Sequence, residues 1–262
     1  MTLLQVEGLT KRFKGLLALE DVSFGAAHGE IVGLVGPNGA GKSTCFNCAT
    51  GFLRPTAGRV MFDGSDVTGM APYRLAARGL VRTFQHSAAF MELTVHENLR
   101  TACYLQDASG IVSSIWKGRR FRVAEMAIDM AVRQIASRVA LETALDTRAS
   151  DLSYGHLRKL GIGIALAANP KCLMLDEPAA GLNGAESKEL VQLLRELRAD
   201  GITVVIVEHD MKLIMSLCNR LVVLSSGRKL AEGSPVDVRG NPEVIRSYLG
   251  TPRPGTRQDA EG

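Results

Sequence analysis

A glycine-rich turn at residues 36–44 constrains the fold more than any other part of the chain. It follows an apolar run at residues 31–35, and its sequence is G-P-N-G-A-G-K-S-T, which fits the pattern G-x-x-x-x-G-K-[ST]. A buried strand that enters such a turn and continues into a helix directs successive backbone N–H groups, and the positive end of the helix, at an anion. The spacing therefore predicts a phosphate-binding loop in an α/β fold.

Each residue type in this loop has a chemical role. Glycines let the backbone approach a polyphosphate closely because no side chain stands in the way. The Lys42 ammonium can reach the β- and γ-phosphates, and the Ser43 hydroxyl can ligate Mg²⁺. We therefore predict a nucleotide-binding loop made of Gly36, Pro37, Asn38, Gly39, Ala40, Gly41, Lys42, Ser43 and Thr44.

Composition narrows the class of protein. The chain has 262 residues, 46% of them hydrophobic, enough to bury a core in one large domain or two small lobes. A net charge of +4 does not by itself indicate nucleic-acid binding. No apolar run approaches the roughly 18 residues of a spanning helix, and the N-terminus has no signal-peptide pattern. We therefore expect a cytosolic chain whose membrane role, if it has one, is peripheral.

The five cysteines are irregularly spaced, which in a cytosolic chain predicts reduced thiols and no disulfide framework. Cys45 and Cys48 form a C-x-x-C, but they fall just inside the helix that follows the phosphate loop, with no second ligand pair nearby. For these two residues we expect core packing and neither metal nor redox chemistry.

Two further apolar runs end in polar side chains. Residues 172–176 lead into Asp176 and Glu177, and residues 202–207 lead towards His209. Continuous apolar runs are typical of strands covered on both faces, as in parallel sheets, which bind ligands at their carboxyl edge. We expect one carboxylate to assist Mg²⁺, the other to polarise an attacking water, and the histidine to contact the γ-phosphate.

The remaining segments predict additional subdomains. Alternating residues at 3–7, 18–24 and 59–62 predict strands near the N-terminus, whereas helical periodicity begins near residue 94. Ser153 is predicted to cap another helix, in which Gly161 and Gly163 would allow close packing against a neighbour. The clearest periodic stripe before it consists of Val123, Met126, Ala127, Met130, Ile135 and Val139.

Taken together in this order, the motifs make residues 1–250 resemble the ATP-binding subunit of an ATP-binding cassette (ABC) transporter. The resemblance implies a P-loop NTPase core, RecA-like with a mainly parallel sheet, an N-terminal antiparallel β subdomain and an inserted helical subdomain. It implies ATP and Mg²⁺ as ligands, an adenine-stacking Phe13, metal contacts by Ser43, Gln85 and Asp176, a catalytic base at Glu177 and a switch histidine at His209. Gln85 would also couple to membrane subunits.

The implied domain boundaries follow the motifs. Residues 1–89 and 161–250 would form the ATP-binding core with its β subdomain, and residues 90–160 the helical subdomain. Residues 251–262 are polar and have no apolar anchor, so we expect a disordered tail.

Residues 152–156, Leu-Ser-Tyr-Gly-His, match the signature motif of the family. Ser153, Gly155 and His156 would bind the γ-phosphate at a second helix N-terminus, although the helical insertion should hold them away from the chain's own loop. The resemblance implies a head-to-tail dimer with an identical or related ATP-binding subunit. His156 replaces the usual Gln, so closure could be weaker or pH-dependent, and Asn183 stands where many relatives have Asp.

Residues 180–183, the signature and the ending Tyr248-Leu249-Gly250 resemble the subfamily that serves branched-chain amino acid import. This implies transmembrane permease partners, an indirect link to a solute-binding protein, no nucleic acid, and a peripheral location at the cytoplasmic face of the plasma membrane. A urea or amide importer and a lipopolysaccharide exporter remain alternatives within transporters. A soluble ABC ATPase acting on DNA or ribosomes is a further alternative, although the chain shows neither long coiled coils nor a second cassette.

Two surface segments have open interpretations. Phe90, Met91 and Leu93 follow Gln85 and could form a groove for a short coupling helix of a permease, or they could pack inside the helical subdomain. Residues 116–122 alternate aromatic and basic side chains and could touch anionic lipid or a partner, or form a solvated basic loop.

Overall fold

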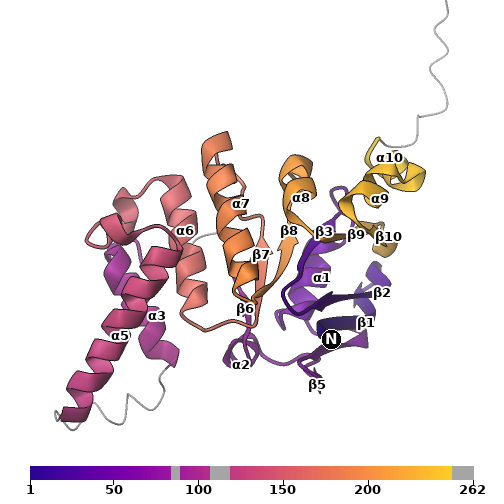
Figure 1. Cartoon of the computed structure of the whole chain (residues 1–262). Coiled ribbons are helices and arrows are strands. Elements are labelled where there is room, and N and C mark those ends of the chain that lie inside the picture. The colour runs from indigo at the N-terminus through magenta and orange to yellow at the C-terminus, as the bar shows by residue number, and fades with distance from the viewer. Residues whose placement is uncertain (84–88, 107–118, 250–262) are drawn as a thin grey trace, which may run out of the picture.

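The larger of two sheets positions the predicted site. The computed structural model describes residues 1–83, 89–106 and 119–249, and in them a six-stranded sheet runs in the order β10-β9-β3-β8-β7-β6 (Figure 1). All neighbouring pairs are parallel except the hairpin of β9 and β10. The strands are β3 (Ile31–Val35), β6 (Leu80–Arg82), β7 (Cys172–Asp176), β8 (Thr203–Val207), β9 (Arg220–Ser225) and β10 (Arg228–Gly233).

The three central strands, β3, β7 and β8, are buried along their whole length. Alternate residues of each strand enter different cores: Leu173, Leu175 and Val204 belong to one, while Met174 and Val205 belong to the other. Both faces of this sheet are therefore covered, which explains why these segments are continuous apolar runs.

The second sheet is antiparallel and has the order β2-β1-β4-β5. Its strands are β1 (Thr2–Phe13), β2 (Leu16–Ala27), β4 (Ala57–Phe62) and β5 (Ser65–Asp66). Together with the parallel sheet it confirms the predicted α/β fold with an N-terminal antiparallel subdomain, although β1 and β2 extend well beyond the predicted ranges 3–7 and 18–24.

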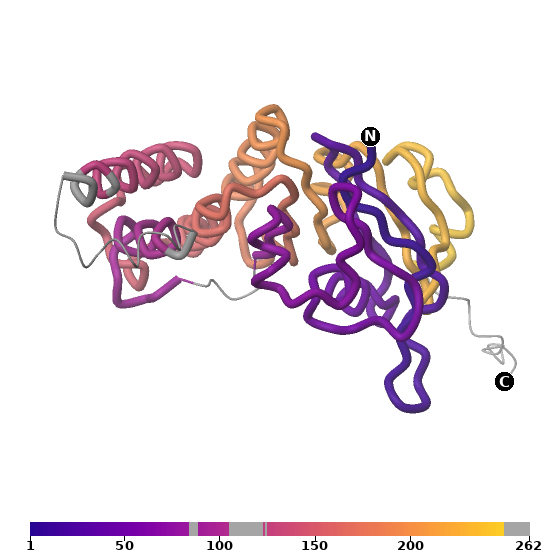
Figure 2. The backbone as a smooth tube through the Cα atoms, turned by 90° about the horizontal axis from the view of Figure 1, so that it is seen from below, coloured from indigo at the N-terminus to yellow at the C-terminus, as the bar shows by residue number. Residues whose placement is uncertain are grey.

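Helices fill the connections between strands and form a separate group at one end of the molecule. Figures 1 and 2 place α3, α5 and most of α6 at that end and the antiparallel sheet at the other. The helices are α1 (Lys42–Ala49), α2 (Pro72–Ala77), α3 (Val95–Gln106), α5 (Arg119–Arg138), α6 (Tyr154–Leu166), α7 (Gly184–Ala199), α8 (Met211–Leu217), α9 (Pro235–Gly240) and α10 (Pro242–Leu249), with short 3-10 helices at Glu142–Ala144 and Ala149–Asp151. Helix α6 runs across residue 160, and the domain boundary at that position stays a prediction. No helix in these described ranges is both long and apolar enough to span a bilayer.

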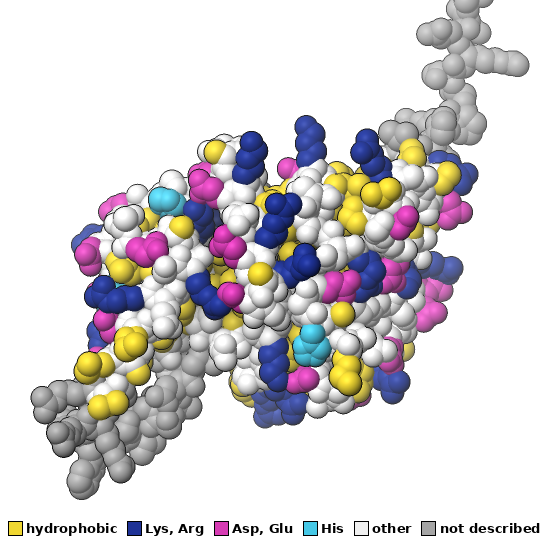
Figure 3. Space-filling view, viewed as in Figure 1, with side chains coloured by type: hydrophobic (Ala, Val, Ile, Leu, Met, Phe, Trp, Pro, Cys, Tyr) yellow, Lys and Arg dark blue, Asp and Glu magenta, His cyan; other side chains and the backbone are white. Residues whose placement is uncertain are grey.

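The predicted apolar stripe on α5 is buried only in its second half. Ile135 and Val139 are in the core, whereas Val123, Met126 and Met130 are 66%, 66% and 61% exposed. Figure 1 shows why: the first turns of α5 extend beyond the end of α6, and Figure 3 shows yellow apolar side chains gathered there. Periodicity identified the helix correctly but overestimated its buried length.

The two helical glycines of α6 differ from each other. A Cβ atom added to Gly163 would lie 3.1 Å from Leu99 Cδ2 and 3.3 Å from Ile135 Cγ2, whereas nothing lies within 4 Å of a Cβ atom added to Gly161. The packing explanation therefore holds for Gly163 and is wrong for Gly161. Cys45 and Cys48 lie in the core as expected, and burial raises the pKa of the Cys48 thiol to about 11.

Candidate nucleotide-binding site

The turn between β3 and α1 has a backbone that requires glycine. Gly36, Gly39 and Gly41 have φ angles of 153°, 80° and 98°, a region that side chains disfavour. A Cβ atom on Gly36 would also lie 2.2 Å from the Leu224 carbonyl oxygen, and one on Gly41 would lie 2.9 Å from that of Ala18. This close approach of neighbouring backbones shapes the loop as the motif predicts.

Lys42 lies inside the loop that it belongs to. Its Nζ donates hydrogen bonds to the carbonyl oxygens of Gly36 and Pro37 at 2.8 and 3.0 Å, and the residue is 6% exposed. Burial lowers the pKa of Lys42, and the nearby Glu177 carboxylate partly opposes this effect. An ammonium has three donors, so the third is available to an anion held by the loop.

A cavity of about 710 Å³ lies in front of the loop. It brings Phe13, Glu177 and His209 together with most of the predicted phosphate-binding residues. Phe13 is 40% exposed and belongs to the cavity lining, with Lys11 Nζ over its ring at 5.0 Å from the ring centre. The lining consists of Phe13, Leu16, Leu17, Ala18, Asn38, Gly39, Ala40, Gly41, Lys42, Ser43, Thr44, Glu177, His209, Ser226 and Gly227. Residues 16–18 and 226–227 were not predicted, because nothing in their local sequence distinguishes them from ordinary turns.

Glu177 and His209 form a pair at the edge of the cavity. Glu177 Oε1 lies 3.0 Å from His209 Nε2. The Glu177 backbone has a φ of 47°, which is strained for a residue with a side chain, and its N–H donates to the Val207 carbonyl oxygen at 2.8 Å. The end of β8 therefore holds Glu177 directly after β7, so that a carboxylate and an imidazole face the same space.

Asp176 lies deeper than Glu177 and does not line this cavity. Its side chain is 9% exposed, and its Oδ2 accepts a hydrogen bond from Arg82 Nη2 at 2.8 Å. The Arg82 guanidinium lies 4.9 Å from the ring centres of both Phe46 and Phe52. Sequence reasoning did not single out Arg82, although an arginine within the apolar run at residues 79–84 was a signal. Gln85, predicted to contact the metal, lies outside the described residues, as do residues 116–118.

Glu208 is a second residue that sequence reasoning missed. It is 4% exposed, and its carboxylate accepts hydrogen bonds from the backbone N–H groups of Ala179 at 2.6 Å and His209 at 3.0 Å. Burial raises the pKa of Glu208 and is the largest influence on it. The backbone contacts with Ala179, His209 and Asp210 lower this pKa less strongly, and the charge of Glu177 raises it slightly further. Glu208 therefore joins the turn after Glu177 to the turn that carries His209.

The signature residues lie elsewhere. Ser153 caps α6 as predicted, its Oγ accepting from the His156 N–H at 3.2 Å. Ser153, Gly155 and His156 are absent from the residues that line the described cavity, and Figure 1 shows α7 and strands of the sheet between α6 and α1. Within one chain the signature and the phosphate loop are not brought together, as the sequence predicted.

The loop before α7 packs against the signature. A Cβ atom on Gly181 would lie 2.9 Å from the Tyr154 ring. Asn183 caps α7 by accepting hydrogen bonds from the Ala185 and Glu186 N–H groups, and the Glu186 side chain completes a capping box. Asn is as good a cap as Asp, so this departure from many relatives retains the helix start.

A glycine-rich turn that opens a helix, with a carboxylate and a histidine from neighbouring parallel strands around one cavity, defines a P-loop ATPase of the cassette class. The ABC transporter family matches residues 19–180, and the chain belongs to that family. A second family, the branched-chain amino acid ATP-binding cassette transporter, matches residues 228–253.

Several curated proteins are similar along almost their whole length. The high-affinity branched-chain amino acid transport ATP-binding protein LivG of Escherichia coli is 46% identical over 250 residues, which are 95% of this chain and 98% of that protein. The corresponding BraF protein of Pseudomonas aeruginosa is 42% identical with the same coverage. The probable LivG of Methanocaldococcus jannaschii is 35% identical over 95% of this chain and 98% of that protein.

Solved structures show the same fold. The ADP conformation of an ATP-binding cassette from an ABC transporter superposes with a TM-score of 0.83 at 33% identity, covering 96% of this chain and all of that one. A dimeric cassette in a post-hydrolysis state with ADP and phosphate gives a TM-score of 0.74 at 25% identity, over 88% of this chain and 98% of that one. The predicted fold class and the prediction of an ABC ATPase are confirmed.

Proposed function

We propose that the chain binds ATP with Mg²⁺ and hydrolyses ATP to power import of branched-chain amino acids through membrane permeases. The single observation that carries the chemistry is the Glu177–His209 pair, 3.0 Å apart, on the wall of the same cavity as the phosphate loop. The substrate class rests on the similarity to LivG and BraF.

The residues divide the work of hydrolysis between them. Backbone N–H groups of the loop and the third proton of Lys42 would hold the phosphates, and Phe13 would stack on the adenine. The Glu177 carboxylate would accept a proton from the attacking water, while His209 holds that carboxylate and contacts the γ-phosphate. Because backbone contacts hold Lys42 and Glu177 in place, little rearrangement of these two residues is needed at the moment of reaction.

The residue types predicted to contact the metal fit a magnesium ion. Hydroxyl and carboxylate oxygens are the ligands that Mg²⁺ prefers, and the Ser43 hydroxyl, exposed in the cavity wall, together with Asp176 and Gln85 would supply them. Bound there, the ion would neutralise charge on the phosphates. The Arg82 contact fixes one oxygen of Asp176 and leaves the other for a metal or its water.

The separated signature supports a two-chain site. Ser153, Gly155 and His156 lie at an exposed helix N-terminus that suits a γ-phosphate, and they would reach one only in an opposing subunit. A similar cassette has been solved as a dimer. We therefore propose a head-to-tail dimer with an identical or related subunit.

Exposed apolar side chains support the proposed permease contact. Phe90 and Met91 are 58% and 41% exposed, and Leu93 is half-buried. Such a surface suits a short amphipathic helix of a permease at the cytoplasmic face of the membrane, with a solute-binding protein beyond it. Co-purification with the permease that survives Phe90→Asp, with the exposed Tyr73→Asp as control, would remove this contact from the proposal.

The first test is ATP-dependent dimerisation of the purified Glu177→Gln variant, because slow hydrolysis would trap the closed state. We expect size-exclusion chromatography with light scattering to give twice the 28.1 kDa of one chain with ATP and a monomer without it. Lys42→Ala combined with Glu177→Gln is the control and should stay monomeric. A monomer in all conditions would exclude an identical partner and point to a related ATPase.

The substrate class needs a separate measurement. In cells that lack the chromosomal copy, wild type should restore uptake of labelled leucine, and Glu177→Gln should not. Restoration of urea uptake without leucine uptake would favour a urea or amide importer. Loss of lipopolysaccharide export with normal uptake would favour an exporter.

A further inference from the structure

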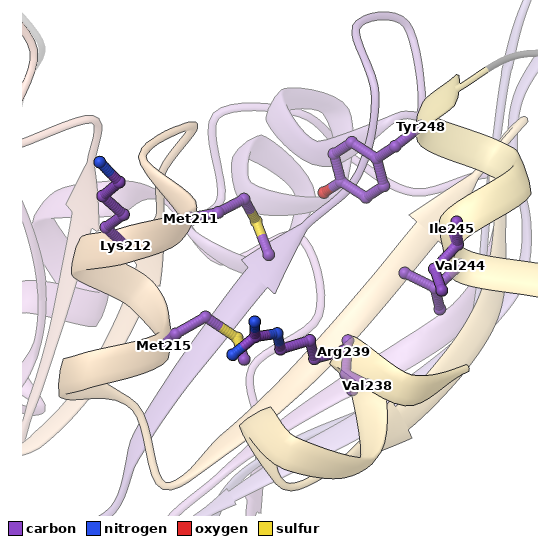
Figure 4. Close-up of a pocket in the computed structure, with 8 residues that line it drawn as sticks. All are labelled: Met211, Lys212, Met215, Val238, Arg239, Val244, Ile245 and Tyr248. Carbon is purple, nitrogen blue, oxygen red and sulfur yellow. The ribbon is translucent and has the colours of Figure 1, made fainter. Parts of the chain in front are cut away.

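A second cavity lies between α8 and the pair α9–α10, and it shares no lining residue with the nucleotide cavity. It has a volume of about 500 Å³ and is lined by Met211, Lys212, Met215, Val238, Arg239, Val244, Ile245 and Tyr248. Figure 4 shows the two methionines pointing into it from α8 and the Tyr248 hydroxyl pointing in from α10. A cavity of this size accommodates a small organic molecule.

The lining combines apolar surface with one cation, the exposed Arg239, whose side chain extends from α9 towards α8 (Figure 4). Met211, Met215, Val238, Val244 and Ile245 supply the apolar surface, and unbranched methionines adapt to ligands of different shapes.

The charged groups at this cavity have one sign. In Figure 4 the Arg239 guanidinium lies beside Met215, whereas Lys212 extends away from the cavity. No carboxylate is present among the lining residues that the structure describes, and no ion pair of Arg239 with a described residue is found. Arginine binds carboxylates through two parallel hydrogen bonds.

The chemistry of the lining selects among small ligands. An amino acid carries an ammonium group, and the described lining offers no carboxylate to pair with it. An aliphatic alcohol or ketone would leave the guanidinium without its anion. A monocarboxylate with a short hydrocarbon chain satisfies both parts of the cavity.

We propose that this cavity binds a small aliphatic monocarboxylate, with its carboxylate on Arg239 and its hydrocarbon chain against Met211, Met215 and Val244. This inference goes beyond the proposed transport function and does not depend on which solute is carried.

The position of the cavity gives such binding a route to the nucleotide site. The Tyr248 phenol lies close to the backbone of Gly36, the first residue of the phosphate loop, and this contact lowers its pKa against the larger, raising effect of burial. On the opposite wall, Met211 begins α8, which is capped by Asp210 directly after His209. A ligand that moves either wall would therefore change the affinity for ATP.

The test is calorimetric titration of the full chain with 4-methyl-2-oxopentanoate, a branched monocarboxylate. We expect saturable binding to wild type, at least tenfold weaker binding to Arg239→Gln, and unchanged binding to Arg246→Gln, an exposed arginine of α10 outside the lining. Leucine and 4-methyl-2-pentanone should each bind at least tenfold more weakly than the acid. The ATP concentration for half-maximal ATPase activity of wild type should shift when the acid is present.

A second variant tests the contribution of the cavity's apolar volume separately from the contribution of the Arg239 charge. Met215→Phe narrows the cavity and retains Arg239, so it should also weaken binding, with its fold checked by circular dichroism. The proposal is overturned if wild type shows no saturable binding, or if Arg239→Gln and Arg246→Gln bind the acid equally well. A second copy of the chain would be the occupant if the acid does not bind wild type and light scattering shows that Met215→Phe abolishes self-association. That result would also overturn the proposal.

Discussion

At the scale of single residues, the buried Glu208 and the half-buried Arg82 organise the site without lining the nucleotide cavity. Glu208 joins the turns that carry Glu177 and His209, and Arg82 fixes the carboxylate of Asp176. Both act through their neighbours, since each holds a group whose own position decides the chemistry. They are positioning residues, and their removal should affect catalysis and stability differently.

We expect Glu208→Gln to lower kcat by about ten- to a hundredfold with a smaller change in KM. The amide oxygen can accept from only one of the two N–H groups that the carboxylate bridges, so the Glu177–His209 geometry loosens while the phosphate loop stays intact. Steady-state ATPase assays measure both constants. The solvent-facing Glu196→Gln on α7 is the matched control, and equal losses in the two variants would show that Glu208 has no positioning role.

The stability contributed by Glu208 should depend on pH in a defined direction. Its folded-state pKa is raised above the ordinary 4.5, mainly by burial, so the protonated form is favoured in the folded protein. The contribution is complete below pH 4.5 and is lost as the pH rises through the raised folded value. Urea unfolding of wild type and Glu208→Gln across this window should show a wild-type advantage that shrinks with increasing pH. An advantage that grows with pH would contradict the sign.

Arg82→Met should reduce the free energy of unfolding by about 3–5 kcal/mol, because it leaves the buried Asp176 carboxylate without its cation. Arg82→Lys should cost less, since it retains the charge but loses the planar fork. Urea unfolding curves provide the comparison, with the exposed Arg78→Met as control. If Arg82→Met and Arg78→Met had the same urea midpoint of unfolding, the Arg82–Asp176 ion pair would not contribute to the stability of the fold.

At the residue level, the sequence predicted local geometry correctly where a local pattern encodes it, as in the glycine turn after β3 and the cap of α6, whereas the ligand contacts of the site residues stay predictions. Spacing alone identified the phosphate loop and the cap at Ser153, because both depend on neighbouring residues. The sequence did not predict the roles of Arg82 and Glu208, because removal of a charge from solvent is a property of the tertiary structure. Each charge is stabilised by partners from other elements, such as Asp176 for Arg82 and Ala179 for Glu208.

At the scale of elements, the burial of the central strands could be predicted from the sequence more completely than the burial of the helices. The runs that became β3, β7 and β8 were predictable because both faces of a central parallel strand are buried. The exposed first half of α5 was not, since periodicity shows which side of a helix is apolar but not how far its partner helices extend. An apolar stripe is therefore a reliable sign of a helix and a weaker sign of its buried length.

The two glycines of α6 provide a matched pair of substitutions. Gly163→Ala should reduce the free energy of unfolding by about 1 kcal/mol, because steric crowding against Leu99 and Ile135 exceeds the gain in helix propensity. Gly161→Ala should increase it by about 0.5–1 kcal/mol, because the added methyl meets nothing within 4 Å. Thermal and urea unfolding measure both changes, and equal effects of the two substitutions would contradict the packing difference.

At the scale of the whole molecule, the fold supports the proposal that one chain carries two separate parts of the nucleotide site. The sheet gathers the phosphate loop, Glu177 and His209 at one cavity, while the helical group carries Ser153 and its neighbours to a different surface. The sequence predicted that the two parts are separated, and the arrangement of α6, α7 and the sheet shows which elements lie between them (Figure 1). Under the proposed function, a complete site therefore requires a second chain.

A mixing experiment tests this division directly. Lys42→Ala removes the phosphate-binding ammonium, and Ser153→Asp retains a helix cap but places a negative charge where the signature would meet a γ-phosphate. Each variant alone should lack ATPase activity because both of its composite sites are defective. In an equal mixture, half of the dimers combine one chain of each kind and contain one intact site of two, so activity should recover to about a quarter of wild type for random pairing. Wild type must itself be active for the comparison to apply. Because a site contained within one chain would be defective in every subunit of the mixture, the absence of recovery would mean that the signature serves its own chain.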